Sequence, residues 1–170
     1  MSKAAQVKAP WLNSRDPEVP AALTYSELSM CSRVEEMVRR YPDYIAYEFM
    51  GKCTTYAEMW KKINACAKSL KAIGIREGDK VTICMPNAPQ TLCMFYAVNM
   101  VGAIANMVHP LSAESEIAFY LRDSGSVAAI TLDQFYNKFE SVRKAVDLPC
   151  LIITLSLIHI SEPTRLGMIS

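Results

Sequence analysis

The sequence lacks the segments that mark several classes of protein. Its 170 residues carry 18 basic and 17 acidic side chains, for a net charge of +1, and no block of like charges stands apart. Surfaces that bind nucleic acid concentrate lysine and arginine, so we expect no nucleic-acid partner. The first six residues contain one lysine with no apolar stretch behind it. A signal peptide is therefore not expected.

Charge is also missing from one long internal stretch. Residues 81–113 contain no Asp, Glu, Lys or Arg, a pattern that could suggest a membrane span. Pro86, Pro89, Asn106 and Pro110 interrupt the stretch, so no apolar run reaches the ~20 residues that a transmembrane helix needs. We predict a buried strand–helix–strand unit and no transmembrane segment.

Paired cysteines are absent from the sequence. The six cysteines lie far apart, form no C-x-x-C pair and fall mostly within apolar runs, where a free thiol behaves as a small hydrophobic group. This usage favours a reducing compartment and predicts a cytoplasmic location. The cysteines are Cys31, Cys53, Cys66, Cys84, Cys93 and Cys150.

Prolines punctuate the N-terminal residues, and we predict that residues 1–23 form an extended arm without regular structure, anchored on a neighbouring surface by Trp11. Thr24 and Glu27 have the spacing of a capping box. Apolar residues then recur at helical intervals, which predicts a helix that ends before Pro42.

Residues 44–50 are predicted to form a strand, joined through a turn at Gly51 and Lys52 to the second strand of a hairpin. A second capping box, at residues 55–58, begins the clearest helix of the sequence. Its predicted apolar face runs to Ile73, and Gly74 is expected to cap its C-terminus.

The sequence from residue 80 onward alternates strand and helix patterns. Strands are predicted at 80–85, 104–108, 127–132 and 150–154, and helices are predicted to begin near Ala88, at Ser112 and at Asp133. The first of these strands is apolar without alternation, as in strands that are covered on both faces. The order predicts an α/β fold with a doubly wound, mostly parallel sheet, in which residues 24–154 form the N-terminal part of a larger domain.

Residues 155–170 resemble a translated sequencing-library adapter. Residues 155–165 match the translation of a transposase-based adapter, and residues 166–168 stand where its variable index would fall. We therefore expect a non-native tail and a native protein that continues beyond Thr154. His159 is excluded from any site for this reason. Missing cover over residues 127–154 would leave apolar surface and a strand edge open, so we expect the chain to aggregate.

Six short motifs occur in a fixed order between Thr54 and Gly125. They are TTYAE (54–58), GIREGDKV (74–81), MPNAP (85–89), AVNMVGA (97–103), HPLSAESEI (109–117) and YLRDSG (120–125). In this order and spacing they resemble the start of the adenylate-forming ligases, in particular the AMP-forming fatty acyl-CoA synthetases. Residues 9–11, APW, resemble the entry segment of bacterial fatty acid ligases.

Two departures from the family pattern bear on this resemblance. His109 stands where the family more often has Asn, and we interpret it as a structural loop residue. Residues 107–110 lack the Val-Pro-Ile-Asp-Pro-like segment of the amino-acid-activating branch. The resemblance therefore favours acyl-CoA chemistry.

The resemblance implies a ligase that uses ATP and Mg²⁺ to adenylate a fatty or related carboxylic acid, after which coenzyme A displaces AMP. The family's Thr/Ser/Gly-rich phosphate loop, Tyr-Gly-x-Thr-Glu segment, ribose-binding Asp and C-terminal Lys do not occur in this chain. We therefore assign no catalytic, cofactor-binding or metal-binding residue. The parent protein is expected to be the enzyme, and this part of it is expected to be inactive.

The sequence offers two weaker alternatives, a phosphate loop and a stand-alone binding module. DSGS at residues 123–126 superficially resembles a phosphate loop, but no Lys follows and it ends a helix instead of starting one. The alternative function is a stand-alone receiver or flavodoxin-like module. A receiver needs carboxylates at strand ends, where none occurs before Asp133, and Gly51-Lys52 is too short for a flavin phosphate loop. Core packing is the interpretation for six aromatic residues: Phe95, Tyr96, Phe119, Tyr120, Phe135 and Phe139.

Overall fold

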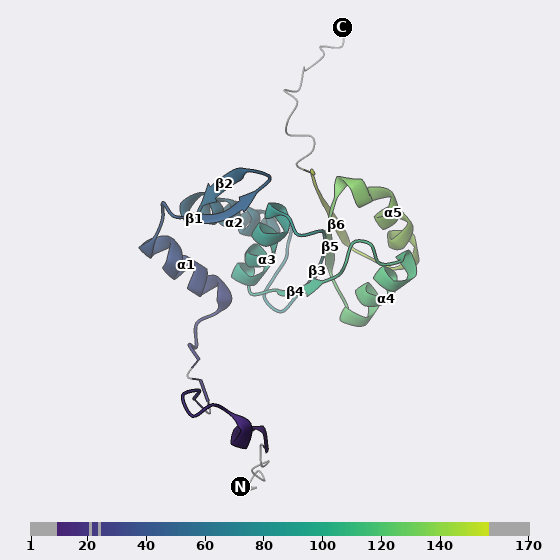
Figure 1. Cartoon of the computed structure of the whole chain (residues 1–170). Coiled ribbons are helices and arrows are strands. Elements are labelled where there is room, and N and C mark those ends of the chain that lie inside the picture. Colours follow the sequence, from purple (N-terminus) through teal and green to yellow (C-terminus); the bar gives the residue numbers. More distant parts are fainter. Residues whose placement is uncertain (1–9, 21, 24, 157–170) are drawn as a thin grey trace.

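The computed structural model describes residues 10–20, 22–23 and 25–156, and Figure 1 shows their arrangement. An arm, a helix and a hairpin precede an α/β sheet in the sequence. The adapter-like tail, including His159, lies outside the described residues from position 157 onward. Its first two residues, Leu155 and Ser156, are described and continue directly from the last strand.

The N-terminal arm contains one element that the sequence did not predict. Pro10–Ser14 form a 3₁₀ helix, η1, so the expectation of an arm without regular structure is wrong at these residues. Proline at the first position of a helical turn forfeits no hydrogen bond, which makes the conformation accessible. The anchoring role predicted for Trp11 is also wrong, because 67% of this residue is exposed.

The first α-helix, α1 (Met30–Arg40), begins later than predicted. Its N-cap is Ser29, whose hydroxyl accepts a hydrogen bond from the Ser32 amide at 3.1 Å. The predicted cap, Thr24, lies outside the described residues. The predicted end is confirmed, since the helix stops before Pro42, whose ring disfavours helical backbone in the residue that precedes it.

A β-hairpin follows α1, as predicted. Strand β1 (Ile45–Phe49) pairs antiparallel with β2 (Lys52–Thr55). The turn lies one residue earlier than predicted: Met50 and Gly51 are its central residues, with φ angles of 51° and 76°. Two successive positive φ angles are what a type I′ turn requires, and the twist of that turn matches the twist of the paired strands.

Helix α2 (Tyr56–Ala72) begins with the predicted capping box. Thr55 Oγ1 accepts a hydrogen bond from the Glu58 amide at 3.3 Å, and Glu58 Oε2 accepts one from the Thr55 amide at 3.0 Å. Ile73, expected on the apolar face, is 52% exposed because the helix ends before it and it serves as the C-cap. The buried face consists of Met59, Ile63, Ala67 and Leu70.

Four parallel strands form the main sheet, in the order β4-β3-β5-β6. The strands are β3 (Lys80–Cys84), β4 (Ile104–Met107), β5 (Ala128–Leu132) and β6 (Cys150–Thr154). The chain adds β4 on one side of β3, returns past β3 to add β5 on the other side, and then adds β6 beyond β5. The parallel, doubly wound sheet predicted from the sequence is confirmed.

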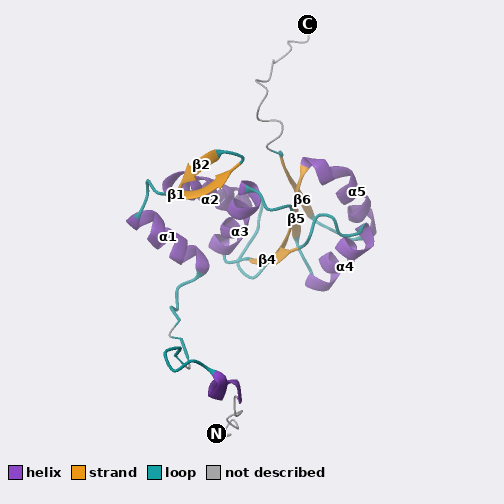
Figure 2. Cartoon of the chain, in the orientation of Figure 1, coloured by secondary structure: helices purple, strands orange, loops and turns teal. Residues whose placement is uncertain are grey.

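Helices cover both faces of this sheet (Figure 2). Helix α3 (Pro89–Val101) lies with α2 over one face, and α4 (Glu114–Ser124) and α5 (Tyr136–Ala145) lie over the other. The change of face follows from right-handed crossovers, because the chain reverses its direction across the sheet after β4.

Two apolar clusters, one on each face, make up the core. Val81 and Ile83 of β3 contribute to the cluster under α2 and α3, whereas Cys84 contributes to the cluster under α4 and α5. Successive strand residues point to opposite faces, so one short strand supplies both clusters. Burial of residues 81–84 agrees with the prediction of a strand covered on both sides.

The charge-free stretch of the sequence folds as the predicted buried unit, β3–α3–β4. Ala88 is the N-cap of α3, and Gly102 ends the helix with a left-handed φ of 84°. Within the described ranges, no helix is both long and apolar enough to cross a membrane.

The two later helices begin differently from the predictions. Ala113, not Ser112, is the N-cap of α4, and its amide donates to Glu116 Oε2 at 2.9 Å, so the glutamate alone supplies the side-chain cap. Asp133 does not cap α5 directly. A 3₁₀ turn, η2 (Asp133–Phe135), intervenes and Phe135 becomes the N-cap.

The aromatic residues expected in the core divide into two groups. Phe119 and Tyr120 contradict the expectation, being 55% and 40% exposed. They lie on the outer side of α4, whose buried face consists of Ile117, Ala118 and Leu121. The others are buried or half-buried against the core: Phe95, Tyr96, Phe135 and Phe139.

Candidate functional site

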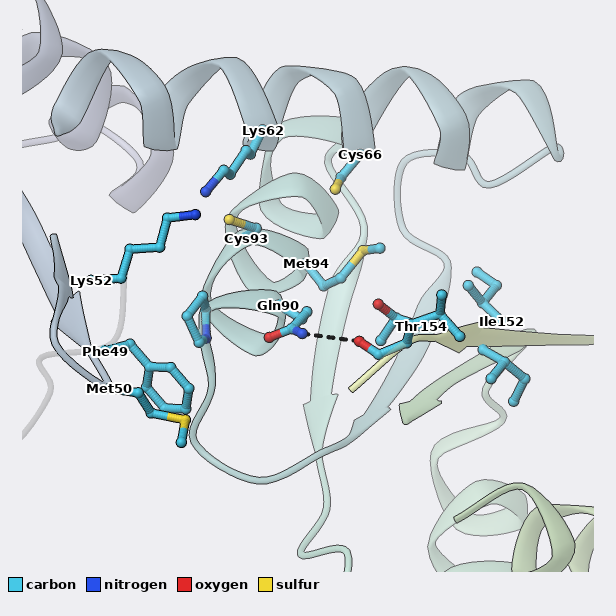
Figure 3. Close-up of a pocket in the computed structure, with 13 residues that line it drawn as sticks. Phe49, Met50, Lys52, Lys62, Cys66, Gln90, Cys93, Met94, Ile152 and Thr154 are labelled. Atoms are coloured by element: carbon cyan, nitrogen blue, oxygen red, sulfur yellow. Dashed lines mark hydrogen bonds between the residues drawn. The ribbon is translucent and has the colours of Figure 1, made fainter. Parts of the chain in front are cut away.

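An open groove lies between the β1–β2 hairpin, helices α2 and α3, and strand β6 (Figure 3). Its volume is about 1050 Å³, comparable with the upper range of small-molecule sites. We call it the hairpin groove. Seven of its lining residues are apolar: Phe49, Met50, Pro89, Met94, Ile152, Ile153 and Leu155. The other six are Lys52, Lys62, Cys66, Gln90, Cys93 and Thr154.

The charge in the hairpin groove is entirely positive. Lys52 extends from β2 and Lys62 from α2, and no acidic side chain lines the groove. Arg33 and Glu36 form the only ion pair within the described part of the chain. Both lysines therefore face the groove without an acidic partner among the described residues, an arrangement that favours an anionic group in this place.

A smaller hollow of about 470 Å³ shares Lys52 and Lys62 with the hairpin groove. Glu58 also lines this hollow, together with Lys61. The Glu58 carboxylate is held by the capping box of α2, where it accepts a hydrogen bond from the Thr55 amide. Lys61 brings the number of ammonium groups around the smaller hollow to three, against the single carboxylate of Glu58. The local charge is therefore positive.

Two thiols, Cys66 and Cys93, form part of the groove wall. The pKa of Cys93 is raised to about 11, chiefly by burial and in part by proximity to Cys66, while Lys62 acts in the opposite direction. Burial also raises the pKa of Cys66. The thiolate is the nucleophilic form of cysteine, and these pKa shifts disfavour it at neutral pH. The two side chains act as apolar wall.

Gln90 lies at the junction of α3 and β6. Its Nε2 donates a hydrogen bond to the carbonyl oxygen of Leu155 at 3.0 Å (Figure 3). Its Oε1 is buried and accepts no hydrogen bond from any described residue. A buried acceptor without a donor costs about 1–3 kcal/mol. The position therefore favours an incoming group that carries an N–H or O–H donor.

Strand β6 contributes more than one face to the groove. Ile152, Ile153, Thr154 and Leu155 are consecutive, and all four line it. Neighbouring strand residues point to opposite faces of a sheet, so a groove that touches all four reaches the edge of the strand. Strand β6 is the last of the four in the sheet, and its outer edge has no partner strand among the described residues.

A hydroxyl network lies on the opposite face of the sheet. Thr82 Oγ1 lies 2.7 Å from Ser126 Oγ, and Asn106 Nδ2 donates to Thr82 Oγ1 at 3.0 Å and to Ser124 Oγ at 3.2 Å. Ser124 and Ser126 hydroxyls are 2.8 Å apart. These serines belong to the DSGS segment at residues 123–126. Their hydroxyl groups bond to one another and to the strands, and the segment ends α4 at Gly125.

His109 lies just beyond β4, at the carboxyl edge of the sheet. Its Nδ1 accepts a hydrogen bond from the Leu111 amide at 3.2 Å. Lys138 of α5 holds the same loop, donating to the carbonyl oxygens of Pro110 at 3.0 Å and Ser112 at 2.5 Å. These contacts fix the loop between β4 and α4 from both sides.

Asp133 lies at the carboxyl end of β5. Its Oδ1 accepts hydrogen bonds from the amides of Gln134 and Ser156, both at 3.0 Å. The bond to Ser156 ties the segment after β6 to the end of β5. In the portion that the structure describes, no group of three or more His, Cys, Asp or Glu side chains is placed to hold a metal ion.

The sequence did not predict the hairpin groove or the hydroxyl network. The groove combines residues from position 49 to position 155, and no local motif connects them. The network had one local signal, the clustered serines at 124 and 126, which in the sequence suggest only a helix end with a superficial likeness to a phosphate loop. Asn106 within an apolar strand was the second available signal.

Comparison with known proteins places the chain in context. The model of the family described as AMP-binding enzyme matches residues 34–166. A long-chain-fatty-acid–CoA ligase of Bacillus subtilis is 30% identical over 149 residues, covering 88% of this chain and 27% of that protein. The long-chain-fatty-acid–CoA ligase FadD13 of Mycobacterium tuberculosis is 37% identical over 95 residues, which are 56% of this chain and 19% of that protein.

A solved structure shares the fold. The N-terminal domain of FACL13 from Mycobacterium tuberculosis superposes with a TM-score of 0.68 at 30% identity, covering 73% of this chain and 33% of that one. The chain thus spans between a fifth and a third of the length of these proteins.

Proposed function

The chain belongs to the AMP-binding enzyme family, and on that premise we propose that it is the N-terminal part of an ATP-dependent acid–CoA ligase. The proposed substrate is a fatty or related carboxylic acid, which the full protein adenylates and transfers to coenzyme A. The observation that carries the proposal is the alignment of 88% of the chain with a long-chain-fatty-acid–CoA ligase. The proposed location is the cytoplasm, in keeping with six unpaired thiols.

ATP, Mg²⁺ and coenzyme A are the proposed co-substrates and cofactor of the full protein. The described residues do not fit a nucleotide site. The hairpin groove offers two lysines but no hydroxyl-rich phosphate loop, and the serines of the DSGS segment are engaged with each other. We therefore assign the groups that bind ATP and Mg²⁺ to residues outside this chain, and propose that the chain alone is inactive.

The sheet order does not discriminate between the two functions considered from the sequence. The order β4-β3-β5-β6 is also the beginning of the flavodoxin-like order. The family match and the ligase relatives favour the ligase over a stand-alone receiver or flavodoxin-like module.

Acid-dependent exchange between ATP and labelled pyrophosphate tests this proposal. The complete gene would be recovered from the source DNA, and its product assayed with saturated acids from two to eighteen carbons. We expect exchange that needs both the acid and Mg²⁺, followed by thioester formation on addition of coenzyme A. Absence of exchange with every acid would overturn the proposed function, and exchange catalysed by the 170-residue chain would overturn its inactivity.

A further inference from the structure

Strand β4 lies at the edge of the main sheet opposite to β6. It pairs with β3 on one side, and its other side has no partner strand among the residues that the structure describes. Edge strands of monomeric proteins usually carry a charged residue, a proline or a bulge, which prevents pairing with another molecule. Strand β4 has none of these: its register with β3 is continuous, and it lies within the charge-free residues 81–113. The outer edge of β4 is therefore open to a further strand.

The backbone of β4 turns alternate residues toward this outer edge. The Ile104 amide donates to the Asp79 carbonyl oxygen at 2.7 Å, and the Val108 amide donates to a carbonyl oxygen of β3 at 3.0 Å. In a parallel ladder one residue turns both its N–H and its C=O toward a given neighbour, and the next residue turns both away. Ala105 and Met107 therefore present their N–H and C=O groups to the outer edge.

The side chains of β4 alternate between the two faces of the sheet. Asn106 points to α4, where its Nδ2 donates to Ser124 Oγ at 3.2 Å, whereas Ala105 packs on the opposite face, against the cluster under α2 and α3. Ile104 and Met107 are the two large apolar side chains of this strand, and both are half exposed. Since side chains alternate along a strand, these two lie on opposite faces.

Apolar surface on α4 adjoins the same edge. Tyr120 lies one turn before Ser124, the residue of α4 that contacts Asn106, so it is on the side of the helix that faces β4. Its ring packs edge-to-face against that of Phe119, with the centroids 5.7 Å apart, and both rings are exposed to solvent. Contiguous exposed apolar surface marks an interaction site.

We infer that β4 pairs with β4 of a second copy of the full-length protein, antiparallel about a two-fold axis through Ala105, so that the two sheets become continuous. In this register the N–H and C=O of Ala105 exchange hydrogen bonds with the same groups of the second copy. The N–H of Met107 meets the C=O of Ala103. Such an interface is isologous, because one surface pairs with itself.

The sequence of β4 matches itself in this register. Met107 lies opposite Ala103, and Ile104 lies opposite Asn106, so each large side chain meets a smaller one of the second copy. A two-fold axis also brings identical residues close together, and like charges directly opposite one another destabilise a sheet. A strand without charged residues meets this condition. This self-match selects a second copy over an unrelated partner.

Sedimentation velocity of the full-length protein tests the inference, because the open β6 edge of the 170-residue chain would add a second route of association. We expect the weight-average mass to double between about 1 and 100 μM, as for a small interface. Met107→Lys should raise the dimer dissociation constant at least ~10-fold, because it places a charge on the edge.

Leu111→Lys is the matched control, since it adds the same charge at a position that is 74% exposed and lies beyond the strand. It should change the dissociation constant by less than ~2-fold, because exposed charges outside an interface contribute little to affinity. A monomer at every concentration, or equal effects of the two lysine variants, would overturn the inference.

Ala105→Pro tests the backbone pairing. It removes an N–H that points outward, so the ladder between β3 and β4 keeps its hydrogen bonds. We expect this variant to be monomeric, with the far-UV circular dichroism of the unsubstituted protein. A folded variant that still forms dimers would contradict the pairing. If the variant does not fold, Met107→Lys decides the question.

Hydrogen exchange distinguishes a second copy from a segment of the same molecule. The amides of Ala105 and Met107 should exchange at least ~5-fold more slowly at about 100 μM than at about 1 μM, whereas the Ile104 amide, which is bonded within the sheet, should not respond to concentration. Equal protection of Ala105 at both concentrations would assign the edge to a strand of the same molecule and reject the dimer.

The inference goes beyond the proposed function and does not depend on it. Pyrophosphate exchange by a protein that stays monomeric would reject the dimer and leave the ligase in place. A dimer without exchange would do the reverse.

Discussion

The hydroxyl of Thr82 lies 2.7 Å from that of Ser126, although the two residues are 44 positions apart in the sequence. The contact joins the middle of β3 to the turn that precedes β5, and Asn106 of β4 donates to the same Thr82 oxygen. Three segments of the sheet therefore meet at one buried hydroxyl. Removing the Thr82 oxygen would break two hydrogen bonds at once, although Asn106 and Ser126 would each keep a bond to Ser124 Oγ.

Replacement of Thr82 by Val should destabilise the fold by about 1–3 kcal/mol, because it removes two hydrogen bonds of a buried network and each is worth about 0.5–1.5 kcal/mol. Thr131→Val is the matched control. Thr131 is equally buried, but its hydroxyl makes one hydrogen bond, to the Cys84 carbonyl oxygen at 2.9 Å. Urea unfolding of both variants measures the difference. Equal losses would show that the network contributes no more than a single hydrogen bond.

Replacement of Thr55 by Ala should cost about 1 kcal/mol, because it removes the side-chain half of the α2 capping box. Ser69→Ala provides the comparison within the same helix. The Ser69 hydroxyl donates to the Ala65 carbonyl oxygen, and alanine is the stronger helix former, so little or no loss is expected. Thermal melts of the two variants decide the matter, and a larger loss for Ser69→Ala would contradict the role of the box.

Gly102 and Gly74 both have positive φ angles, 84° and 97°, but their surroundings differ. A Cβ at Gly102 would lie 3.0 Å from Cγ of Glu77, whereas a Cβ at Gly74 would meet nothing within 4 Å. Each Gly→Ala substitution should cost about 1–2 kcal/mol for the left-handed backbone, and Gly102→Ala should cost more. Chemical denaturation of the pair tests this order, which an equal or reversed result would refute.

Stability should fall between pH 9 and pH 11. Burial raises the pKa of both Cys84 and Cys93 from 9.0 to about 11, so the unfolded chain loses these protons at lower pH than the folded one. The contribution is complete below pH 9 and is lost as pH rises through 11. The double variant Cys84→Ala, Cys93→Ala should begin less stable but lose less between pH 8 and 10.5. If the urea midpoint of the double variant fell with pH as steeply as that of the unsubstituted chain, the two thiols would not be the source of the pH dependence.

The edge of β6 should promote self-association of the 170-residue chain. Ile153 is 36% exposed on this strand, and a charged residue on an edge opposes strand pairing between molecules. Ile153→Lys should therefore increase the monomer fraction in size-exclusion chromatography. Leu23→Lys, at an exposed position of the arm, controls for the added charge. An equal increase in the monomer fraction for both variants would mean that net charge, and not the edge of β6, governs self-association.

Local signals predicted much of the fold. The capping box at Thr55 and Glu58 involves residues three positions apart, and it occurs where the sequence places it. Strand β6 has the predicted bounds, Cys150–Thr154. In these places the interaction that fixes the boundary is contained within a short stretch, which makes it visible in the sequence.

The start of α1 shows why other boundaries were missed. The Cys31 amide, in the first turn of that helix, donates to Asn99 Oδ1 of α3 at 3.1 Å, across 68 residues. The first amides of a helix need partners outside it, and here a distant side chain provides one. A cap-like residue at Thr24 carried no information about that contact. The hairpin groove was not predicted for the same reason, since its walls come from five separate elements, β1, β2, α2, α3 and β6.

The central position of β3 has a consequence for synthesis on the ribosome. Its two partners emerge at different times, because β4 begins at Ile104 and β5 at Ala128. The first crossover, β3–α3–β4, can therefore close while the second side of β3 still has no neighbour. That side must stay unpaired during the translation of 24 further residues, from the first residue of β4 to the last before β5. Slowing translation over this interval lengthens the time for which a trigger-factor-like chaperone can engage the nascent sheet.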